Sequence, residues 1–250
     1  MLLKGKLISI TAAVLVLVLS FAALYVIWQS KFNVNAIDRE TLYQISAFNT
    51  FSSGQYDGNT TYSQLAEHGD FGIGTVNGLD GEMVALNGVF YQIPVDGKTR
   101  QLSSSAKTPY ATVTFFEADQ TIHVSDALNY SELTAYINQT LPSQNAIYAI
   151  KVNGIFDYAK TRSVPMQTVP YPMLTEAVSH QSVFNLSNVS ATAVGFYFPS
   201  SMDGVDFAGY HLHFLTDDHL AGGHLLDCIV RNATIEIDYT YKFTLVLPQT

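Results

Sequence analysis

The sequence predicts a fold of the α/β (mixed α+β) class. Two domains are expected, each with mixed, largely antiparallel β-sheets and a few short helices. Its 250 residues are 48% hydrophobic and 13% charged, which is enough apolar material for a sizeable core in one or two domains. Short runs of β-branched and aromatic residues, separated by Gly, Asn, Asp and Pro, are typical of strands. Three of the eight prolines lie within residues 164–172, which favours a passage between two domains there.

The first domain, residues 31–168, is expected to be mostly sheet. Residues 42–47 are predicted to form its first strand and residues 62–68 a short helix. A second helix is predicted over residues 131–140, with Ser131 as its N-cap. The remaining strands are predicted at residues 81–86, 89–93, 111–116 and 146–152.

The second domain, residues 169–250, is expected to begin with a helix over residues 173–180 and to continue as a sheet. Its strands are predicted at residues 194–198, 209–215, 224–230 and 233–247.

Residues 1–30 carry the features of a targeting segment. Lys4 and Lys6 precede an uncharged apolar stretch over residues 7–28, as in a secretory signal with a basic start. This stretch approaches the ~20 residues that span a bilayer, so a cleaved signal peptide and an uncleaved signal anchor both fit. Either one predicts export. The protein would be secreted and extracellular, or tethered to a membrane through residues 7–28 with its domains outside the cytoplasm.

The charge balance excludes one class of partner. Lys and Arg number 12 against 21 Asp and Glu, for a formal net charge of −9. Such a chain repels phosphate backbones, so we expect no nucleic-acid partner. The single cysteine rules out an intramolecular disulfide, so an exported domain would depend on its core and on metal.

Three histidines have the spacing of metal ligands on a two-stranded ribbon. His211 and His213 are two residues apart in an apolar run, so both side chains should point to the same face of a strand. Residues 216–219 are rich in turn formers, and a second strand-like run begins at His224. A hairpin centred between residues 218 and 219 places His224 directly across from His213 and diagonal to His211, about 5 and 8 Å away at the Cβ atoms.

Three imidazoles that converge in this way indicate an open metal site. Three protein nitrogens with a free coordination position are typical of catalytic zinc, whereas closed four-ligand sites are structural. The alternative is a hairpin that only carries surface histidines. His219 falls at the turn apex and is expected to be a solvated turn residue. Cys228 shares the face of His224 by strand parity but lies about 13 Å along the strand, so a buried, inert thiol is predicted.

Several separated motifs resemble the α-acetolactate decarboxylase family. They are HGDFGIGT at residues 68–75, LDGEM at residues 79–83, and YHLHF at residues 210–214 followed by GGH at residues 222–224. The resemblance extends from about residue 43 to residue 250. It implies a two-domain α/β fold with mixed sheets and a zinc ion.

The resemblance also assigns site residues. It implies that His211, His213 and His224 are the zinc ligands, that Glu82 is an active-site carboxylate and that Arg162 is an active-site cation. It places Thr75 in the lining of the same pocket. Without it, Glu82 would be read as a solvated turn carboxylate and Arg162 as a surface residue.

The implied activity is a zinc-dependent decarboxylation of 2-acetolactate to acetoin and CO2, a lyase reaction of acetoin biosynthesis. The metal would chelate the hydroxyl and ketone oxygens and stabilise the enediolate, so no organic cofactor is needed. Arg162 would hold the substrate carboxylate in a fixed fork, and Glu82 would deliver a proton to one face of the enediolate. The small molecule 2-acetolactate is the expected partner, and a homo-oligomer, a dimer, is expected.

Two alternatives remain open from the residues themselves. One is another metal enzyme, a hydrolase that uses metal-bound hydroxide or a metal-dependent oxygenase. The other is an exported, non-catalytic metal-binding module. The resemblance implies a further C-terminal segment with a second active-site glutamate beyond residues 243–248. No residue of this chain takes that role, so the chain is expected to be truncated at its C-terminus.

Overall fold

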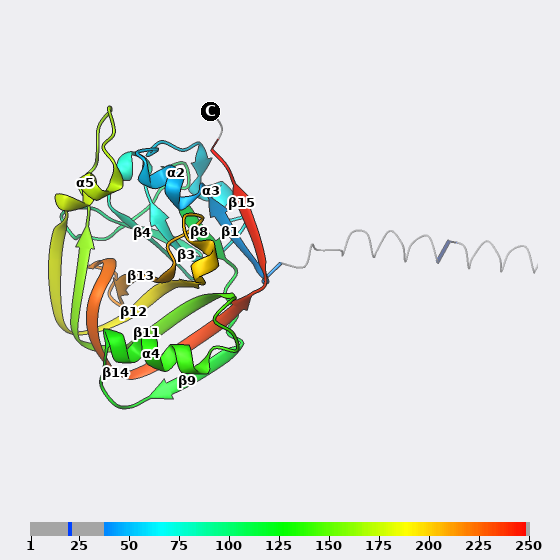
Figure 1. The fold of residues 1–250 in the computed structure, drawn as a ribbon, viewed down its shortest axis with the longest axis vertical. Helices are drawn as coiled ribbons and strands as arrows, with labels where there is room; N and C mark the ends of the chain where they lie inside the picture. The colour runs from blue at the N-terminus through cyan, green and yellow to red at the C-terminus, as the bar shows by residue number, and fades with distance from the viewer. Residues whose placement is uncertain (1–19, 22–37, 249–250) are drawn as a thin grey trace, which may run out of the picture. The chain divides into compact units, whose positions relative to one another are not determined.

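Two large β-sheets pack against each other in the part of the chain from Arg39 onward, which forms one compact unit (Figure 1). The computed structural model describes residues 20–21 and 38–248. The targeting segment predicted over residues 1–30 therefore lies almost wholly outside the described residues. Among the helices that are described, none is long and apolar enough to cross a bilayer.

The first sheet has seven strands and supplies one wall of the site described below. Its strands in spatial order are β15 (Lys242–Val246), β1 (Thr41–Ile45), β8 (Ala111–Thr114), β3 (Phe71–Thr75), β4 (Glu82–Leu86), β5 (Val89–Ile93) and β6 (Arg100–Gln101). The pair β1 and β15 is parallel and the other neighbours are antiparallel, so the sheet is mixed. A separate two-stranded sheet is formed by β2 (Thr60–Thr61) and β7 (Lys107–Thr108).

The second sheet is built from long, curved strands that close on themselves. Its strands in spatial order are β10 (Leu128–Asn129), β14 (Gly222–Thr240), β11 (Ile147–Ser163), β12 (Ser182–Phe198) and β13 (Gly209–Thr216), and β9 (Gln120–Val124) pairs with β14. Because β13 also pairs with the start of β14, the four strands β11 to β14 form a ring.

The helices are short, as predicted, and lie around the sheets (Figure 1). They are α2 (Phe48–Ser52), α3 (Tyr62–Leu65), α4 (Tyr130–Thr140) and α5 (Leu174–Ser179), with 3₁₀ turns η1 (Asn77–Leu79) and η2 (Ser200–Met202). Largely antiparallel mixed sheets with a few short helices confirm the predicted mixed α+β class.

The N-cap of α4 and the division of the last two strands were predicted wrongly. The N-cap of α4 is Asn129 rather than Ser131, because the Asn129 side chain accepts the Glu132 backbone N–H at 2.9 Å while the Glu132 carboxylate accepts the Asn129 backbone N–H at 2.9 Å. The strands predicted at residues 224–230 and 233–247 are divided elsewhere, since β14 runs without interruption to Thr240 and β15 belongs to the other sheet.

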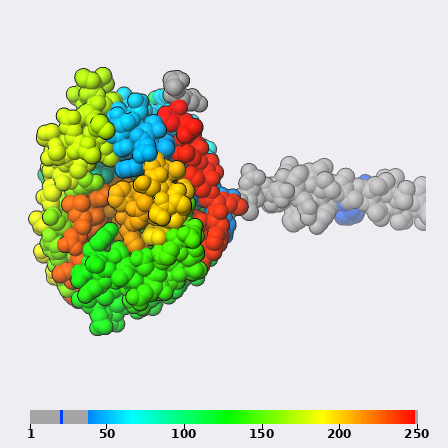
Figure 2. Space-filling model, viewed as in Figure 1, coloured from blue at the N-terminus to red at the C-terminus, as the bar shows by residue number. Residues whose placement is uncertain are grey.

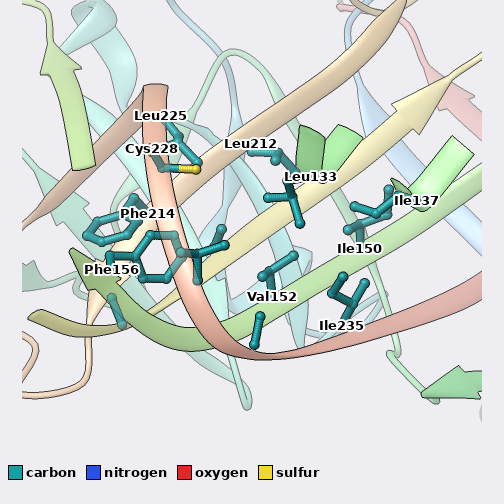
Figure 3. Packing of buried hydrophobic residues seen from close by; sticks show 14 of the residues in the cluster. Leu133, Ile137, Ile150, Val152, Phe156, Leu212, Phe214, Leu225, Cys228 and Ile235 are labelled. Atoms are coloured by element: carbon teal, nitrogen blue, oxygen red, sulfur yellow. The ribbon is translucent and has the colours of Figure 1, made fainter. Parts of the chain in front are cut away.

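The alternation of side chains along β13 gives the second sheet two different faces. Leu212 and Phe214 point into the core enclosed by the ring, where they pack with Phe156, Leu225 and the α4 residue Leu133 (Figure 3). Leu215, on the other parity, belongs to the core between the two sheets. His211 and His213 share the parity of Leu215, so they face the first sheet.

The domain division at residue 168 stays a prediction. In the structure this position falls in the connection between β11 and β12, which are paired along their whole length from Tyr148–Tyr197 to Ser163–Ser182. The connection carries α5, which borders the site.

Candidate metal centre

The hairpin of β13 and β14 has the register that the sequence predicts. His213 pairs directly with His224, and Leu215 pairs with Gly222. The turn is closed by backbone hydrogen bonds from Thr216 to Ala221 at 3.0 Å and from His219 to Thr216 at 2.8 Å. Gly223 at φ +131° has Arg162 of β11 close behind it, because a Cβ there would lie 2.5 Å from the Arg162 carbonyl oxygen. Only glycine therefore allows the two strands to approach so closely.

The three histidine rings converge on one point. Their centroids are 5.3 Å apart for His211 and His213, 5.1 Å for His211 and His224, and 5.3 Å for His213 and His224. One nitrogen from each ring lies within 4.8 Å of the other two. This is a three-nitrogen arrangement of the kind that holds a divalent metal.

The protonation of His213 follows from its surroundings. Its Nδ1 lies 2.8 Å from the Met83 carbonyl oxygen, and a carbonyl only accepts, so Nδ1 carries the proton and Nε2 a lone pair. This Nε2 is buried, has no hydrogen-bond partner and lies 3.4 Å from Oε2 of Glu82. Lone pairs on two atoms this close repel each other. A proton on Glu82 or a cation at Nε2 of His213 removes that repulsion.

Burial favours the neutral form of His213 and His224, which is the form that binds a metal. It lowers the pKa of His213 well below its usual value, and the neighbouring His211 lowers it further. The pKa of His224 is also lowered well below its usual value by burial, with His211, Arg162 and His213 adding to the shift. The residues present therefore fit a metal ion, because the buried Nε2 of His213 has no partner and belongs to a group of three convergent imidazoles.

Glu82 is brought to the histidines by the first strand-turn-strand unit of the seven-stranded sheet. It is the first residue of β4 and pairs with Thr75 at the end of β3. The turn before it needs Gly81, which has φ +79° and whose Cβ would lie 2.3 Å from the Ile93 carbonyl oxygen. Glu82 is 8% exposed, and burial raises its pKa to about 7 against the opposing charges of Arg162 and His211.

Arg162 reaches the site from β11, where its backbone pairs with His224. Its Nη1 donates to Oε1 of Gln181 at 3.2 Å, while its Nε is buried without a partner. The guanidinium thus keeps donor capacity free inside the site. Its charge acts on Glu82, His213 and His224, as their pKa shifts record.

Thr75 has a defined local role in the wall of the site. Its hydroxyl donates to the Gly81 carbonyl oxygen at 2.6 Å, and its backbone N–H donates to the Tyr110 carbonyl oxygen at 3.1 Å. It therefore ties the turn that carries Glu82 to strand β3.

A cavity of about 330 Å³ joins these groups. The segments that border it meet on the face shown in Figure 2: α2 in blue, α5 in yellow-green, the loop before β13 in gold and the start of β14 in orange. Its polar lining is Thr75, Glu82, Arg162, His211, His213 and His224, and its apolar lining includes Phe48, Phe51, Leu79, Tyr110, Val164, Leu174, Val178, Phe207 and Leu226. Sequence reasoning missed the apolar lining, because α2, α5 and Tyr110 come from distant parts of the chain and no local pattern marks them.

Two further residues near the motif lie apart from the site. His219 is exposed in the turn, as expected, with φ +56° and its Nδ1 3.2 Å from the Tyr91 hydroxyl. Cys228 is a buried free thiol whose pKa burial raises to about 12. The predicted shared face with His224 was wrong, because β14 has a bulge at Leu226 that reverses the alternation. Cys228 therefore points into the ring core between Leu225 and Phe214 (Figure 3).

The chain is similar to one family over nearly all of its described length. The family model for alpha-acetolactate decarboxylase matches residues 42–250. An alpha-acetolactate decarboxylase of Methanosarcina mazei is 49% identical over 209 residues, which cover 84% of this chain and 73% of that protein. The Bacillus subtilis alpha-acetolactate decarboxylase is 37% identical over 209 residues, which cover 84% of this chain and 82% of that protein.

Solved structures give the same result. The crystal structure of the Bacillus subtilis alpha-acetolactate decarboxylase superposes with a TM-score of 0.82 at 37% identity, covering 84% of this chain and 90% of that one. A Staphylococcus aureus protein described as similar to alpha-acetolactate decarboxylase superposes with a TM-score of 0.81 at 33% identity, covering 83% and 89%.

Proposed function

Because the chain belongs to the alpha-acetolactate decarboxylase family, we propose that it is a carbon–carbon lyase that converts 2-acetolactate to acetoin and CO2. The observation that carries the proposal is the pairing of three convergent histidines with Glu82 in one cavity. The bare Nε2 of His213 lies 3.4 Å from the Glu82 carboxyl, and Arg162 lines the same space.

We propose zinc as the metal, held by His211, His213 and His224. Three imidazole nitrogens with an open position suit catalytic zinc. When bound, the metal would supply a Lewis acid next to the ketone and hydroxyl oxygens of the substrate.

Arg162 is proposed to bind the substrate carboxylate. A guanidinium presents its donors in a fixed fork that matches the two carboxylate oxygens. The Gln181 side chain holds one end of that fork through Nη1, and the buried, unpartnered Nε leaves the group able to donate to a ligand. The bond to be broken is then fixed in orientation.

Glu82 is proposed to deliver the proton that completes the reaction. The bond between the carboxylate carbon and the hydroxyl-bearing carbon breaks, and its electron pair moves toward the ketone as CO2 leaves. One proton must then be added to the hydroxyl-bearing carbon to give acetoin. Glu82 is the buried carboxyl that faces the same space from β4, so it can donate to a single face of the intermediate.

The apolar lining gives the site its dry environment. Phe48 and Phe51 of α2, with Leu174 and Val178 of α5, border the cavity beside the charged groups. Such walls suit the two methyl groups of 2-acetolactate. They also strengthen the interaction of Arg162 with a bound carboxylate by excluding water.

The proposal is tested by incubating the purified, zinc-loaded protein with racemic 2-acetolactate and measuring acetoin and bound zinc on the same samples. We expect acetoin from the native chain and from His123→Ala, which changes an exposed histidine on β9, and neither acetoin nor stoichiometric zinc with His213→Ala. Absence of acetoin from folded, zinc-loaded protein would refute the decarboxylase proposal. Turnover of an ester panel, or oxygen uptake after iron loading, would instead indicate a hydrolase or an oxygenase.

We also propose that the protein is exported through residues 1–30 and works as a homodimer. Fractionation of cells expressing the full chain should place it in the secreted or the membrane fraction, and recovery from the cytosol alone would contradict export. Light scattering of the purified protein measures the oligomeric state directly.

A further inference from the structure

A second buried carboxylate lies beside the histidine trio. Asp206 is 1% exposed and precedes β13 in the loop that follows η2. Its Oδ1 is 3.9 Å from Nδ1 of His211, at the outer limit of an ion pair. Neither the spacing of the histidines nor the family motifs pointed to this residue.

The Asp206 carboxylate is held in place from both sides. Its Oδ1 accepts the backbone N–H of Phe207 at 2.6 Å, and its Oδ2 accepts the hydroxyl of Thr112 at 3.0 Å. Thr112 lies on β8 of the other sheet, so this bond fixes the loop against the seven-stranded sheet. The preceding residue is anchored as well, since the Val205 carbonyl oxygen accepts the side-chain amide of Gln44 at 2.7 Å.

Burying a carboxylate in this way costs free energy unless charged or polar groups pair with it or donate hydrogen bonds to it. The two donors that hold Asp206 leave lone pairs unused, because an ionised carboxylate has room for about four donors. The Tyr110 side chain is close enough to feel the charge of Asp206, but its hydroxyl has no hydrogen-bond partner. Its hydroxyl keeps its proton, because burial and the charge of Asp206 raise the pKa of Tyr110 well above its usual value.

The ring of His211 has a matching open donor. Its Nδ1 is buried and has no hydrogen-bond partner. In His213 the corresponding Nδ1 is directed by the Met83 carbonyl oxygen, which leaves Nε2 for a ligand. His211 has no such carbonyl at hydrogen-bond distance, and the group that faces its Nδ1 is the Asp206 carboxylate.

We propose that Asp206 is the positioning residue for His211: its carboxylate receives the Nδ1–H of the ring, so that Nε2 keeps its lone pair for the metal. The inference rests on the proposed metal site at the histidine trio. Outer carboxylates of this kind fix the tautomer and orientation of a ligating histidine and increase its basicity, and their loss costs 10–100-fold in metal affinity.

The test measures metal binding directly and does not depend on turnover. The metal-free native protein, Asp206→Asn and the matched control Asp203→Asn are titrated with Zn²⁺ against a chelator of known affinity and with Co²⁺ by visible absorption. Asp203 is exposed and lies three residues earlier, so its substitution makes the same charge change away from the trio. We expect Asp206→Asn to bind zinc 10–100-fold more weakly and to shift the Co²⁺ absorption bands. Asp203→Asn should match the native protein in both.

The outcomes separate this inference from the proposed function. If the native protein binds neither Zn²⁺ nor Co²⁺, the metal site itself is refuted. If the native protein binds both, and Asp206→Asn shows the same affinity and the same Co²⁺ bands, only the role of Asp206 is overturned.

A second variant covers the case in which Asp206→Asn does not fold. Thr112→Val keeps the carboxylate and the side-chain shape but removes the hydroxyl that holds Oδ2. A loss of metal affinity of up to 10-fold with altered Co²⁺ bands supports the role of Asp206, and unchanged binding and bands overturn it.

Discussion

The two ends of strand β14 bury titratable groups for different reasons. At its start, His224 stands beside His211 and His213, and burial lowers its pKa well below the usual value. Near its end, Asp238 is 3% exposed, and burial raises its pKa to about 7. Both shifts favour the neutral form of the group, so by that measure alone the two ends are equivalent.

What distinguishes the ends is the state of the polar atoms. Oδ2 of Asp238 accepts the Glu117 backbone N–H at 3.1 Å, and the carboxylates of Asp119, Glu40 and Glu117 raise its pKa further by repulsion. At the other end, nitrogen atoms from three rings converge, one of them buried and unpartnered, beside a cavity. A shifted pKa therefore shows only that a group is buried. Polar atoms that converge without hydrogen-bond partners are what identifies the binding site.

The largest effect should follow from removing a ligand at the start of β14. His224→Ala leaves two of three nitrogens, and we expect metal affinity to fall by more than the 10–100-fold that loss of an outer partner costs, with acetoin formation falling to background. Metal content by mass spectrometry and the acetoin assay measure this. Retained stoichiometric metal would show that His224 is not a ligand and would remove the contrast between the two ends.

Glu82→Gln should separate chemistry from metal binding at the same end. The amide keeps the size of the carboxyl but cannot donate a proton for transfer, so we expect kcat to fall roughly 10²-fold or more while zinc content stays at the native level. Steady-state kinetics on zinc-loaded protein checks this. Unchanged kcat would exclude Glu82 as the proton donor. The burial of its carboxyl would then have no functional explanation.

The histidine end could be predicted from sequence because its geometry is local. His211, His213 and His224 belong to one hairpin, so strand parity and turn position were sufficient to give the observed pairing of His213 with His224. The mixed, mostly antiparallel fold could be predicted for a similar reason, since short β-branched runs and turn residues are local signals.

The rest of the site depends on contacts between distant segments. Glu82 meets His213 across two sheets, and Arg162 meets His224 through the pairing of β11 with β14. Only the family resemblance singled out these two residues. Asp206 was missed altogether, because its partner Thr112 is 94 positions away in the chain. The bulge at Leu226 likewise changed the facing of Cys228 without a local sequence signal.

At the other end of β14, Asp238→Asn should change the pH dependence of stability. The folded pKa of Asp238, about 7, lies above its ordinary 3.8, so the carboxyl favours the folded state fully below pH 3.8 and this contribution is lost as pH rises through 7. Asparagine does not ionise, so the variant keeps the same stability contribution at this position as the pH rises. Between pH 5 and pH 8 we expect the unfolding free energy of the variant to gain roughly 2–3 kcal/mol relative to the native chain.

Urea denaturation at the two pH values measures this difference, and the acetoin assay at pH 7 is the control. Activity should be unchanged, because Asp238 lies at the end of β14 away from His224. Identical pH dependence in the two chains would show that Asp238 ionises normally. A loss of acetoin formation would instead connect both ends of the strand to function.

The smallest effect is expected at the turn between β13 and β14. His219 has φ +56° and is exposed, and asparagine tolerates this left-handed conformation at least as well as histidine does. His219→Asn loses the 3.2 Å contact between Nδ1 and the Tyr91 hydroxyl, which is exposed to water. We therefore expect the unfolding free energy to stay within about 0.5 kcal/mol of the native value, with metal affinity unchanged. Chelator competition and thermal unfolding check both, and a clear fall in metal affinity would mean that the metal centre extends into the turn, beyond the three convergent rings.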